Sequence, residues 1–323
     1  MSTAKENLNK QMTAVLYKYF PQTKELANFL IDTLDLSKES AYRRLRNEVY
    51  YTFEEIVILC QKLELSIDKI AGVNAKKAFL DMPLYKAEKP EEIYKEIIEW
   101  NIRAIKKIYQ AKDSIQYTVL NRLPHGITMY SEPIAKFQYY KWYIHKYKGK
   151  VKTPFHEFEV PECLNYLFRE YFKTSEDLTE KMRLILDENI FLYLIKEIQY
   201  CRDSNFIDSQ SLEIMKEELY KIVDLTANVA RTGTNKSNAD IKIYLSGVDI
   251  EPNYTYAEYD DNIIFFIWSP SGEIVTSTNP EFCARQKDWI DSLMRYTTLI
   301  TQCNEIKQLE FFDKQRKYIS EMK

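Results

Sequence analysis

The stretch LSKESAYRRLRNE, residues 36–48, places three arginines and a tyrosine on a short helical segment that a serine opens. The hydroxyl of Ser37 can accept a hydrogen bond from an otherwise unpaired amide of the first helical turn. On a helix from Ser37, Ala41 and Leu45 lie four residues apart and face the protein interior. The opposite side is a set of long polar side chains, namely Lys38, Glu39, Tyr42, Arg43 and Arg46.

Two interpretations of this polar side are open. It is either a solvated helix surface that only keeps the chain in solution, or a surface that reads DNA. The planar guanidinium of arginine can donate two hydrogen bonds to guanine in the major groove, and lysine and tyrosine can bind phosphates or base edges. The context favours DNA, because an apolar helix ending in LIDTLDLS comes shortly before this helix and a capped apolar helix follows it. In such a pair the second helix enters the major groove while the first crosses the backbone.

Helical patterns before residue 72 predict a five-helix unit. Thr52 and Glu55 have the spacing of a capping box, and Asn47 tolerates the left-handed conformation that ends many helices. Pro21 ends the first helix, because a proline disfavours helix in the residue before it. The five predicted helices cover residues 8–20, 23–34, 37–47, 52–63 and 66–72.

The residues FLIDTLDLSKESAYRRLRNE, followed by YTFEEIVILCQKLELSIDKI, resemble the DNA-binding domain of bacterial helix-turn-helix transcriptional regulators of the phage-repressor type. The resemblance covers about the first 72 residues. It implies that Lys38, Glu39, Tyr42 and Arg43 face bases and that Arg44 and Arg46 face phosphates. With two serines, the predicted DNA-binding set is Ser37, Lys38, Glu39, Ser40, Tyr42, Arg43, Arg44 and Arg46.

The sequence departs from the family pattern at two positions. Ile31 stands where the two helices approach most closely and where the family usually has alanine. Asp35 stands where the family usually has the glycine of the turn, and aspartate can adopt the left-handed conformation at modest cost. An isoleucine at the closest approach can change the crossing angle of the two helices.

A chain of 323 residues predicts two domains, since a domain averages about 150 residues. We expect a DNA-binding domain at 1–78, a charged, proline-containing linker at 79–90, and a helical domain at 91–323. Residues 190–198 are apolar almost all round and predict a helix in the middle of a bundle. Only residues 241–278 look like strands, in a meander of three or four. The predicted fold class is mostly α: a five-helix DNA-binding domain and a larger helical domain containing a small antiparallel β-meander, loosely similar to the C-terminal half of some of these regulators.

The composition is compatible with DNA binding but does not by itself indicate it. The net charge is −3, and residues 1–78 contain 12 Lys and Arg against 10 Asp and Glu. The polar start MSTAKENLNKQM and the lack of an apolar run near 18 residues predict a cytoplasmic protein without membrane contact. The five cysteines show no C-x-x-C spacing and are expected to be reduced core residues.

The sequence predicts a regulator that binds double-stranded DNA, not an enzyme. No catalytic residue, cofactor or metal site is expected, because the chain has no G-x-S-x-G, P-loop or Rossmann glycine pattern. His125, His145 and His156 also lack the i, i+4 spacing of a helical metal pair. The competing hypothesis is a protein-interaction or scaffolding module whose helix-turn-helix has no DNA target, and an enzyme in the second region comes third.

Three stretches of the second region leave alternatives open. Residues 135–153 mix six lysines with aromatic residues, which suits single-stranded nucleic acid, although aromatics packed inward beneath wet lysines are the favoured interpretation. The stretch YTYAEYDDNIIFFIW, residues 254–268, lines either a pocket for an effector or, by default, the core. A homodimer is expected, because two reading helices must lie about 34 Å apart on DNA. Its candidate stripe, of a kind that is more often intramolecular core, is Trp289, Leu293, Tyr296, Ile300, Phe311, Phe312, Tyr318 and Ile319.

Overall fold

The computed structural model describes residues 4–63, 65–67, 70, 78–147, 153–269 and 271–323. The chain divides into two compact units, Met1–Phe79 and Leu80–Lys323, which we call unit 1 and unit 2. Among the described helices, none combines the length and the apolar character that crossing a membrane requires.

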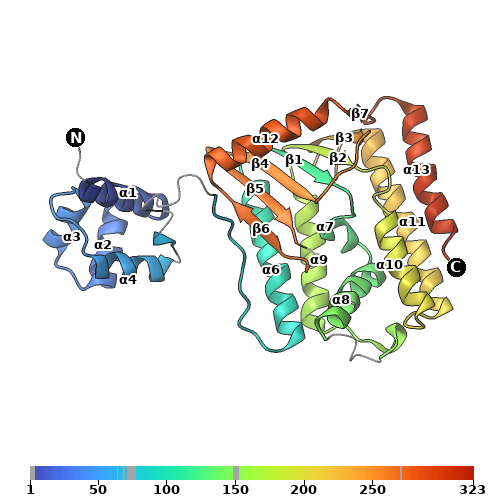
Figure 1. The fold of residues 1–323 in the computed structure, drawn as a ribbon, viewed down its shortest axis with the longest axis horizontal. Coiled ribbons are helices and arrows are strands. Elements are labelled where there is room, and N and C mark those ends of the chain that lie inside the picture. The colour runs from blue at the N-terminus through green and yellow to red at the C-terminus, as the bar shows by residue number, and fades with distance from the viewer. Residues whose placement is uncertain (1–3, 64, 68–69, 71–77, 148–152, 270) are drawn as a thin grey trace. The chain divides into compact units, whose positions relative to one another are not determined.

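Unit 1 is a small helical unit (Figure 1), and its helices pack around one apolar core. Its described helices match four of the predicted ones closely, whereas the predicted helix at 66–72 lies largely outside the described residues. The four are α1 (Ala4–Tyr19), α2 (Thr23–Leu34), α3 (Lys38–Leu45) and α4 (Phe53–Leu63). Each helix contributes buried side chains to the core, including Met12, Leu16, Leu26, Leu30, Ala41, Leu45, Ile56 and Leu59.

A fragment of residues 1–79 is expected to fold by itself, because the apolar faces of α1 to α4 close on one another within unit 1. Far-ultraviolet circular dichroism of this fragment should show a helical spectrum and one cooperative thermal transition. A spectrum without a transition contradicts the expectation and places the domain boundary elsewhere.

Unit 2 is built on a seven-stranded mixed sheet (Figure 1). The strand order is β6-β5-β4-β1-β2-β3-β7, in which β1, β2 and β3 are parallel and the remaining pairs are antiparallel. The strands are β1 (Ser114–Leu120), β2 (Lys181–Leu186), β3 (Asp240–Ser246), β4 (Tyr254–Tyr259), β5 (Asn262–Trp268), β6 (Ile274–Ser277) and β7 (Thr297–Leu299).

This sheet shows that the predicted fold class, mostly α with a small antiparallel meander, is wrong. The four predicted strands exist as β3 to β6, but β3 pairs with β2 instead of joining the meander. The prediction missed β1, β2 and β7, because a short apolar run cannot be assigned to helix or strand from periodicity alone. Parallel pairing of β1, β2 and β3 also requires long crossover connections, which leave no local signal in the sequence.

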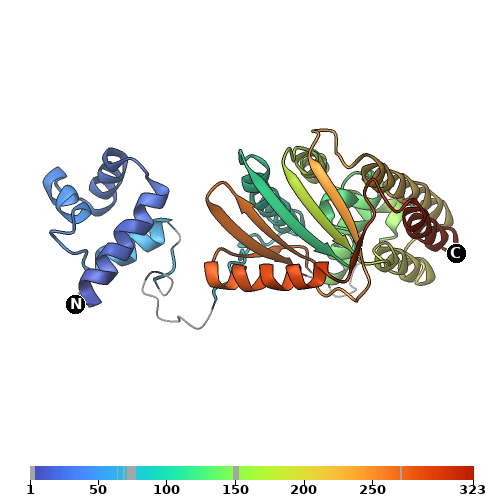
Figure 2. The same ribbon diagram turned by 90° about the horizontal axis from the view of Figure 1, so that it is seen from above.

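Helices cover both faces of the sheet unequally (Figure 2). On one face, α12 (Pro280–Met294) is the one helix that the described residues place there, with Cys283 and Ile290 against Val119, Ile185 and Phe265. The other face carries the main core of unit 2, where α8 packs against α6, α9 and α11, and α13 packs against α10 and α11. These helices are α6 (Pro90–Tyr109), α7 (His125–Thr128), α8 (Glu132–Lys146), α9 (Glu162–Glu176), α10 (Leu192–Asp203), α11 (Ser209–Thr232) and α13 (Glu305–Ser320), with a 3-10 turn at Phe155–Glu157.

Of the predicted linker at 79–90, residues 80–90 belong to unit 2, and several of them contact its sheet or core. The backbone of Asp81 pairs with that of Thr276 beside β6, at N–O distances of 2.7 and 2.9 Å. Tyr85 and Ala87 pack against the main core, and α6 already begins at Pro90. The two units divide after residue 79, and the segment from Leu80 to the start of α6 packs on unit 2.

Two predicted apolar stretches of unit 2 contribute most of their apolar side chains to its core. The stretch predicted to be a buried helix, residues 190–198, lies mostly in α10. Leu194, Ile195 and Ile198 are buried there, whereas Tyr193 is exposed. In the candidate dimer stripe, only Trp289 and Tyr296 are largely exposed, at 65% and 61%. The buried members belong to the core of unit 2, and they are Ile300, Phe311, Phe312 and Ile319.

The basic and aromatic stretch at 135–153 forms most of α8. Phe137, Tyr139 and Tyr140 are buried, and Tyr139 stacks against Trp142. Lys141 forms an ion pair with Glu197 at 2.7 Å. The described aromatic rings thus pack inward, as the favoured interpretation has it, while residues 148–152 lie outside the described residues.

Candidate nucleic-acid interface

The turn between α2 and α3 is tight because Asp35 adopts the left-handed conformation, with φ 51° and ψ 49°. Its amide donates to the carbonyl of Ile31, and the amide of Leu36 donates to the same oxygen at 3.3 Å. Aspartate therefore supplies the left-handed residue that closes α2 and turns the chain into α3. Ile31 packs at the edge of the core, while Leu30 and Ala41 are buried in it.

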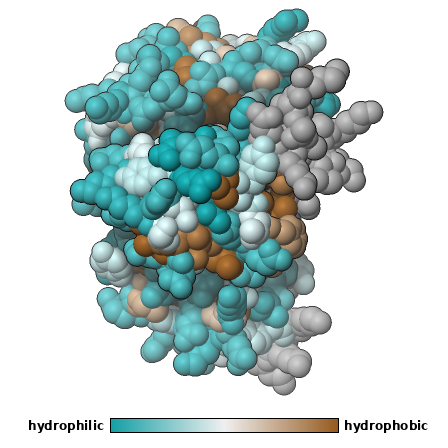
Figure 3. All heavy atoms as spheres, turned by 90° about the vertical axis from the view of Figure 1, so that its left-hand side faces the viewer, coloured by the Kyte–Doolittle hydropathy of each residue, from teal (hydrophilic) through white to brown (hydrophobic). Residues whose placement is uncertain are grey.

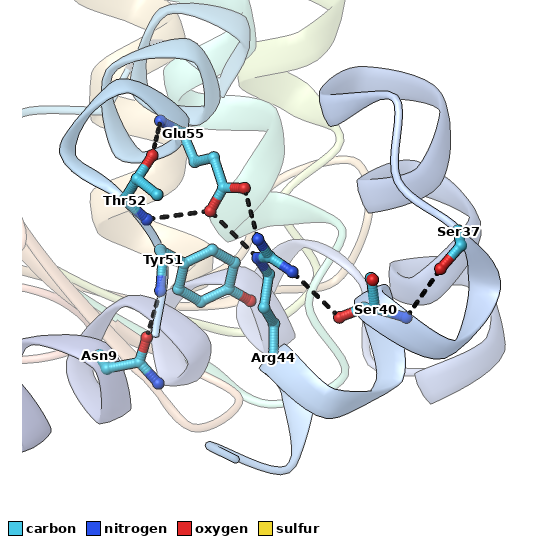
Figure 4. A network of polar contacts seen from close by, with 7 residues as sticks. All are labelled: Asn9, Ser37, Ser40, Arg44, Tyr51, Thr52 and Glu55. Atoms are coloured by element: carbon cyan, nitrogen blue, oxygen red, sulfur yellow. Dashed lines mark hydrogen bonds and ion pairs between the residues drawn. The ribbon is translucent and has the colours of Figure 1, made fainter. Parts of the chain in front are cut away.

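Side-chain hydrogen bonds fix both ends of α3, and Figure 4 shows the one at its start, between Ser37 and Ser40. The Ser37 hydroxyl accepts from the Ser40 amide at 3.2 Å, which confirms the predicted N-cap. After α3, Asn47 is left-handed with φ 60°, and its side-chain oxygen accepts from Asn9 Nδ2 at 2.6 Å. Asn9 also accepts from the Tyr51 amide at 3.0 Å, so α1 holds the segment between α3 and α4.

The outer side of α3 is largely exposed. Lys38 and Glu39 are exposed in the first turn, and the side chains of Arg43 and Arg46 are 50% and 55% exposed. Tyr42 is partly buried and packs against the core of unit 1, so only part of its ring is available. Of the remaining predicted DNA-binding residues, Ser37 is exposed, and Ser40 and Arg44 are partly buried.

Arg44 lies inside unit 1 and does not join the exposed donors. Its Nε donates to Glu55 Oε2 at 3.0 Å and its Nη2 donates to Oε1 at 2.7 Å, a two-pronged pair between α3 and α4 (Figure 4). The two side chains are only 11% and 15% exposed. Glu55 also accepts from the Thr52 amide at 2.9 Å, as the capping box predicts. Arg44 is therefore removed from the predicted phosphate-facing set, because its guanidinium is already paired.

Glu48 is a member of this surface that the sequence prediction missed. Its carboxylate lies 2.6 Å from Arg46 Nε and 3.7 Å from Arg43 Nε. The hydrogen bond from Arg46 lowers the pKa of Glu48, and the same bond raises the pKa of Arg46. Glu48 thus holds the two exposed arginines together at the C-terminal end of α3, and an anion that binds there must compete with it. In the sequence, the only sign of this role is that Glu48 is an acidic residue two positions after Arg46.

Metal-ligating side chains and cysteines are the other reactive groups of the described residues. No group of three or more His, Cys, Asp and Glu side chains within the described residues is placed to hold a metal ion. Cys60, Cys201 and Cys283 are buried as predicted, but Cys163 is exposed and Cys303 is partly exposed.

No model of a known protein family matches the chain, and no characterised protein or solved structure matches it either.

Proposed function

We propose that unit 1 binds double-stranded DNA in a sequence-specific manner, with α3 in the major groove, and that the chain is a transcriptional regulator. The observation that carries the proposal is the geometry of α3. It follows α2 through a tight turn, buries Ala41 and Leu45, and exposes charged side chains on its opposite side. A helix presented in this way is what reading of the major groove requires.

The proposed roles follow from where each side chain stands on α3. The first turn of a recognition helix reaches the base edges, so Lys38 and Glu39 contact bases, with glutamate able to accept from cytosine N4. Arg43 contacts guanine, and Arg46, just beyond the end of the helix, contacts a phosphate. Tyr42 contributes only the exposed part of its ring. No role on DNA is assigned to Arg44.

The decisive experiment is selection of fragments that the full chain binds from a random pool of double-stranded DNA, followed by affinity measurements at several salt concentrations. A specific protein enriches a defined sequence, and its binding constant falls steeply as salt rises, because cations are released from each neutralised phosphate. Absence of any enriched sequence overturns the proposal.

Replacing Arg43 and Arg46 separately by alanine is expected to have different effects. Arg43→Ala should cost about 1–3 kcal/mol of binding free energy at the selected site and change binding to unrelated DNA little, because it removes a base contact. Arg46→Ala should weaken binding to all sequences by a similar factor and reduce the salt dependence, because it removes a phosphate contact. Fluorescence anisotropy with selected and scrambled duplexes measures both. Equal behaviour of the two variants contradicts the assigned roles.

Glu48→Gln is expected to strengthen DNA binding about two- to five-fold at moderate salt. The substitution removes a carboxylate that pairs with two arginines of this surface, and an exposed ion pair that must be given up costs about 0.2–1 kcal/mol. Glu54→Gln provides a matched control on α4. A Glu48→Gln variant with unchanged or weaker affinity contradicts the idea that Glu48 competes with phosphate.

A second candidate function is a protein-interaction module, which the exposed hydrophobic residues of α4 favour. Phe53 is 68% exposed and Ile58 is 42% exposed. The space-filling view of Figure 3 shows a mostly hydrophilic surface on which hydrophobic residues gather in patches. Replacing both residues by serine leaves DNA binding intact if α3 is the functional surface. Binding that survives high salt, or that needs Phe53 and Ile58, points to this alternative.

We also propose that the regulator acts as a homodimer, because one α3 can read only half of a site. Of the predicted stripe, the exposed side chains Trp289 and Tyr296 are the ones that can contact a second copy. Light scattering of the full chain, alone and with a duplex of the selected sequence, measures its mass. A monomer that binds DNA as one copy per site contradicts the dimer.

A further inference from the structure

Unit 2 contains a largely apolar cavity of about 410 Å³ between the sheet and four helices of its main core. The floor is formed by residues of β1, β2, β3, β4 and β5, and the walls by α6, α7, α9 and α11. This volume lies within the range of about 300–1,000 Å³ that is usual for small-molecule sites. Representative lining residues are Ile105, Leu184, Leu186, Val229, Ile243 and Phe266.

Polar residues stand at the middle of the sheet where a core would use aliphatic ones. Gln116 and Thr118 of β1 and Thr255 of β4 line the cavity and are buried. The Thr118 and Thr255 hydroxyls share a hydrogen bond of 3.0 Å, and Gln116 Nε2 donates to the Tyr109 hydroxyl at 3.3 Å. Burying polar groups costs free energy unless they are paired, and a pocket typically has a few such groups among apolar ones.

Two lining residues carry buried donors without a partner in the described part of the chain. They are the hydroxyl of Tyr171 on α9 and the indole Nε1 of Trp268 on β5. Burial raises the pKa of Tyr171 well above its usual value, so the hydroxyl remains protonated and can donate. An unpaired buried donor costs about 1–3 kcal/mol, and a ligand oxygen beside it removes that cost. These donors are an observation independent of the cavity's size.

The charged groups at the rim cancel each other. Lys236, whose side chain is 70% exposed, pairs with Glu176 at 2.6 Å, and both residues line the cavity. The exposed lysine indicates that the cavity reaches the surface at this point. A paired rim offers no net charge that would select an ionic ligand.

We infer that this cavity binds an uncharged, apolar small molecule that carries a hydrogen-bond-accepting oxygen, such as a ketone or an ester, held by the Tyr171 hydroxyl. The apolar body of the ligand lies against the sheet and α11. The three residues of the 254–268 stretch that line the cavity are Thr255, Phe266 and Trp268, so that stretch contributes to a ligand site as well as to the core. This inference does not rest on DNA binding.

The test uses 6-propionyl-2-(dimethylamino)naphthalene, an uncharged fluorescent ketone, titrated into the full chain without DNA. We expect saturable binding of one molecule per chain with emission shifted to shorter wavelength. Tyr171→Phe, which keeps the ring, should weaken binding about tenfold, in line with one lost hydrogen bond. The same variant should be at least as resistant to urea as the parent in the absence of the probe, because it removes an unpaired polar group.

Two further variants separate this site from nonspecific binding. Thr226→Phe fills the cavity from α11 and should abolish the shifted emission. Tyr166→Phe removes an exposed hydroxyl from the same helix as Tyr171 and should leave the affinity unchanged. Absence of saturable binding, binding that survives Thr226→Phe, or unchanged affinity in Tyr171→Phe overturns the inference, whatever the outcome of the DNA experiments.

Discussion

Replacing Arg44 by alanine is expected to lower the free energy of unfolding of unit 1 by about 3–5 kcal/mol. The guanidinium makes two hydrogen bonds with Glu55, and both side chains are largely shielded from solvent, at 11% and 15% exposed. Removing one partner leaves the other charge in a poorly hydrated place, which costs far more than the loss of an exposed pair. Because Arg44 joins α3 to α4, the loss should also release α3. Hydrogen exchange of the full chain, followed by mass spectrometry, measures the opening of unit 1 separately from unit 2.

Two control variants show whether the loss of stability comes from the Arg44–Glu55 pair. Arg46→Ala removes an exposed arginine two residues away and should change the stability of unit 1 by less than about 1 kcal/mol. Glu55→Gln keeps an acceptor for the Thr52 amide but loses the charge, so its effect should fall between those of the two arginine variants. If Arg44→Ala exchanges as slowly as Arg46→Ala, the pair is not a structural contact, and Arg44 returns to the set available for DNA.

Replacing Asn101 by alanine is expected to lower the free energy of unfolding of unit 2 by about 2–6 kcal/mol. Asn101 lies on α6 and is fully buried. Its Nδ2 donates to the Gly272 carbonyl at 2.8 Å, and its Oδ1 accepts from the Ile274 amide at 3.1 Å. Alanine removes the hydrogen-bond partner of two buried backbone groups, and leaving such a group unpaired costs about 1–3 kcal/mol.

The neighbouring residue supplies the comparison for this second prediction. Trp100→Phe removes a single hydrogen bond from the indole to the Ile274 carbonyl, at 2.9 Å, and should cost about 1 kcal/mol. Urea unfolding of the full chain, followed through hydrogen exchange of β5 and β6, ranks the two variants. An Asn101→Ala variant that is as stable as Trp100→Phe contradicts the assigned role of Asn101.

Unit 1 could be predicted closely because its signals are local. Ser37 caps α3, and Thr52 and Glu55 cap α4, through contacts only three residues apart in the chain. The apolar residues of each helix recur with the helical period, so the buried face follows from the sequence. The left-handed turn at Asp35 is also a property of one residue and its neighbours. The sequence by itself therefore determined the helices of unit 1 and which side of α3 is polar.

Tertiary structure decided which of those polar side chains are available. Arg44 and Arg46 are alike in the sequence, yet Glu55 of α4 buries the first and leaves the second exposed. In unit 2, β3 pairs with β2 across a crossover of more than fifty residues, although β4 follows it directly in the chain. The cavity also depends on side chains from strands and helices far apart in sequence. Pairings of this kind depend on how elements pack against one another, and periodicity and capping within one element carry no information about its distant partners.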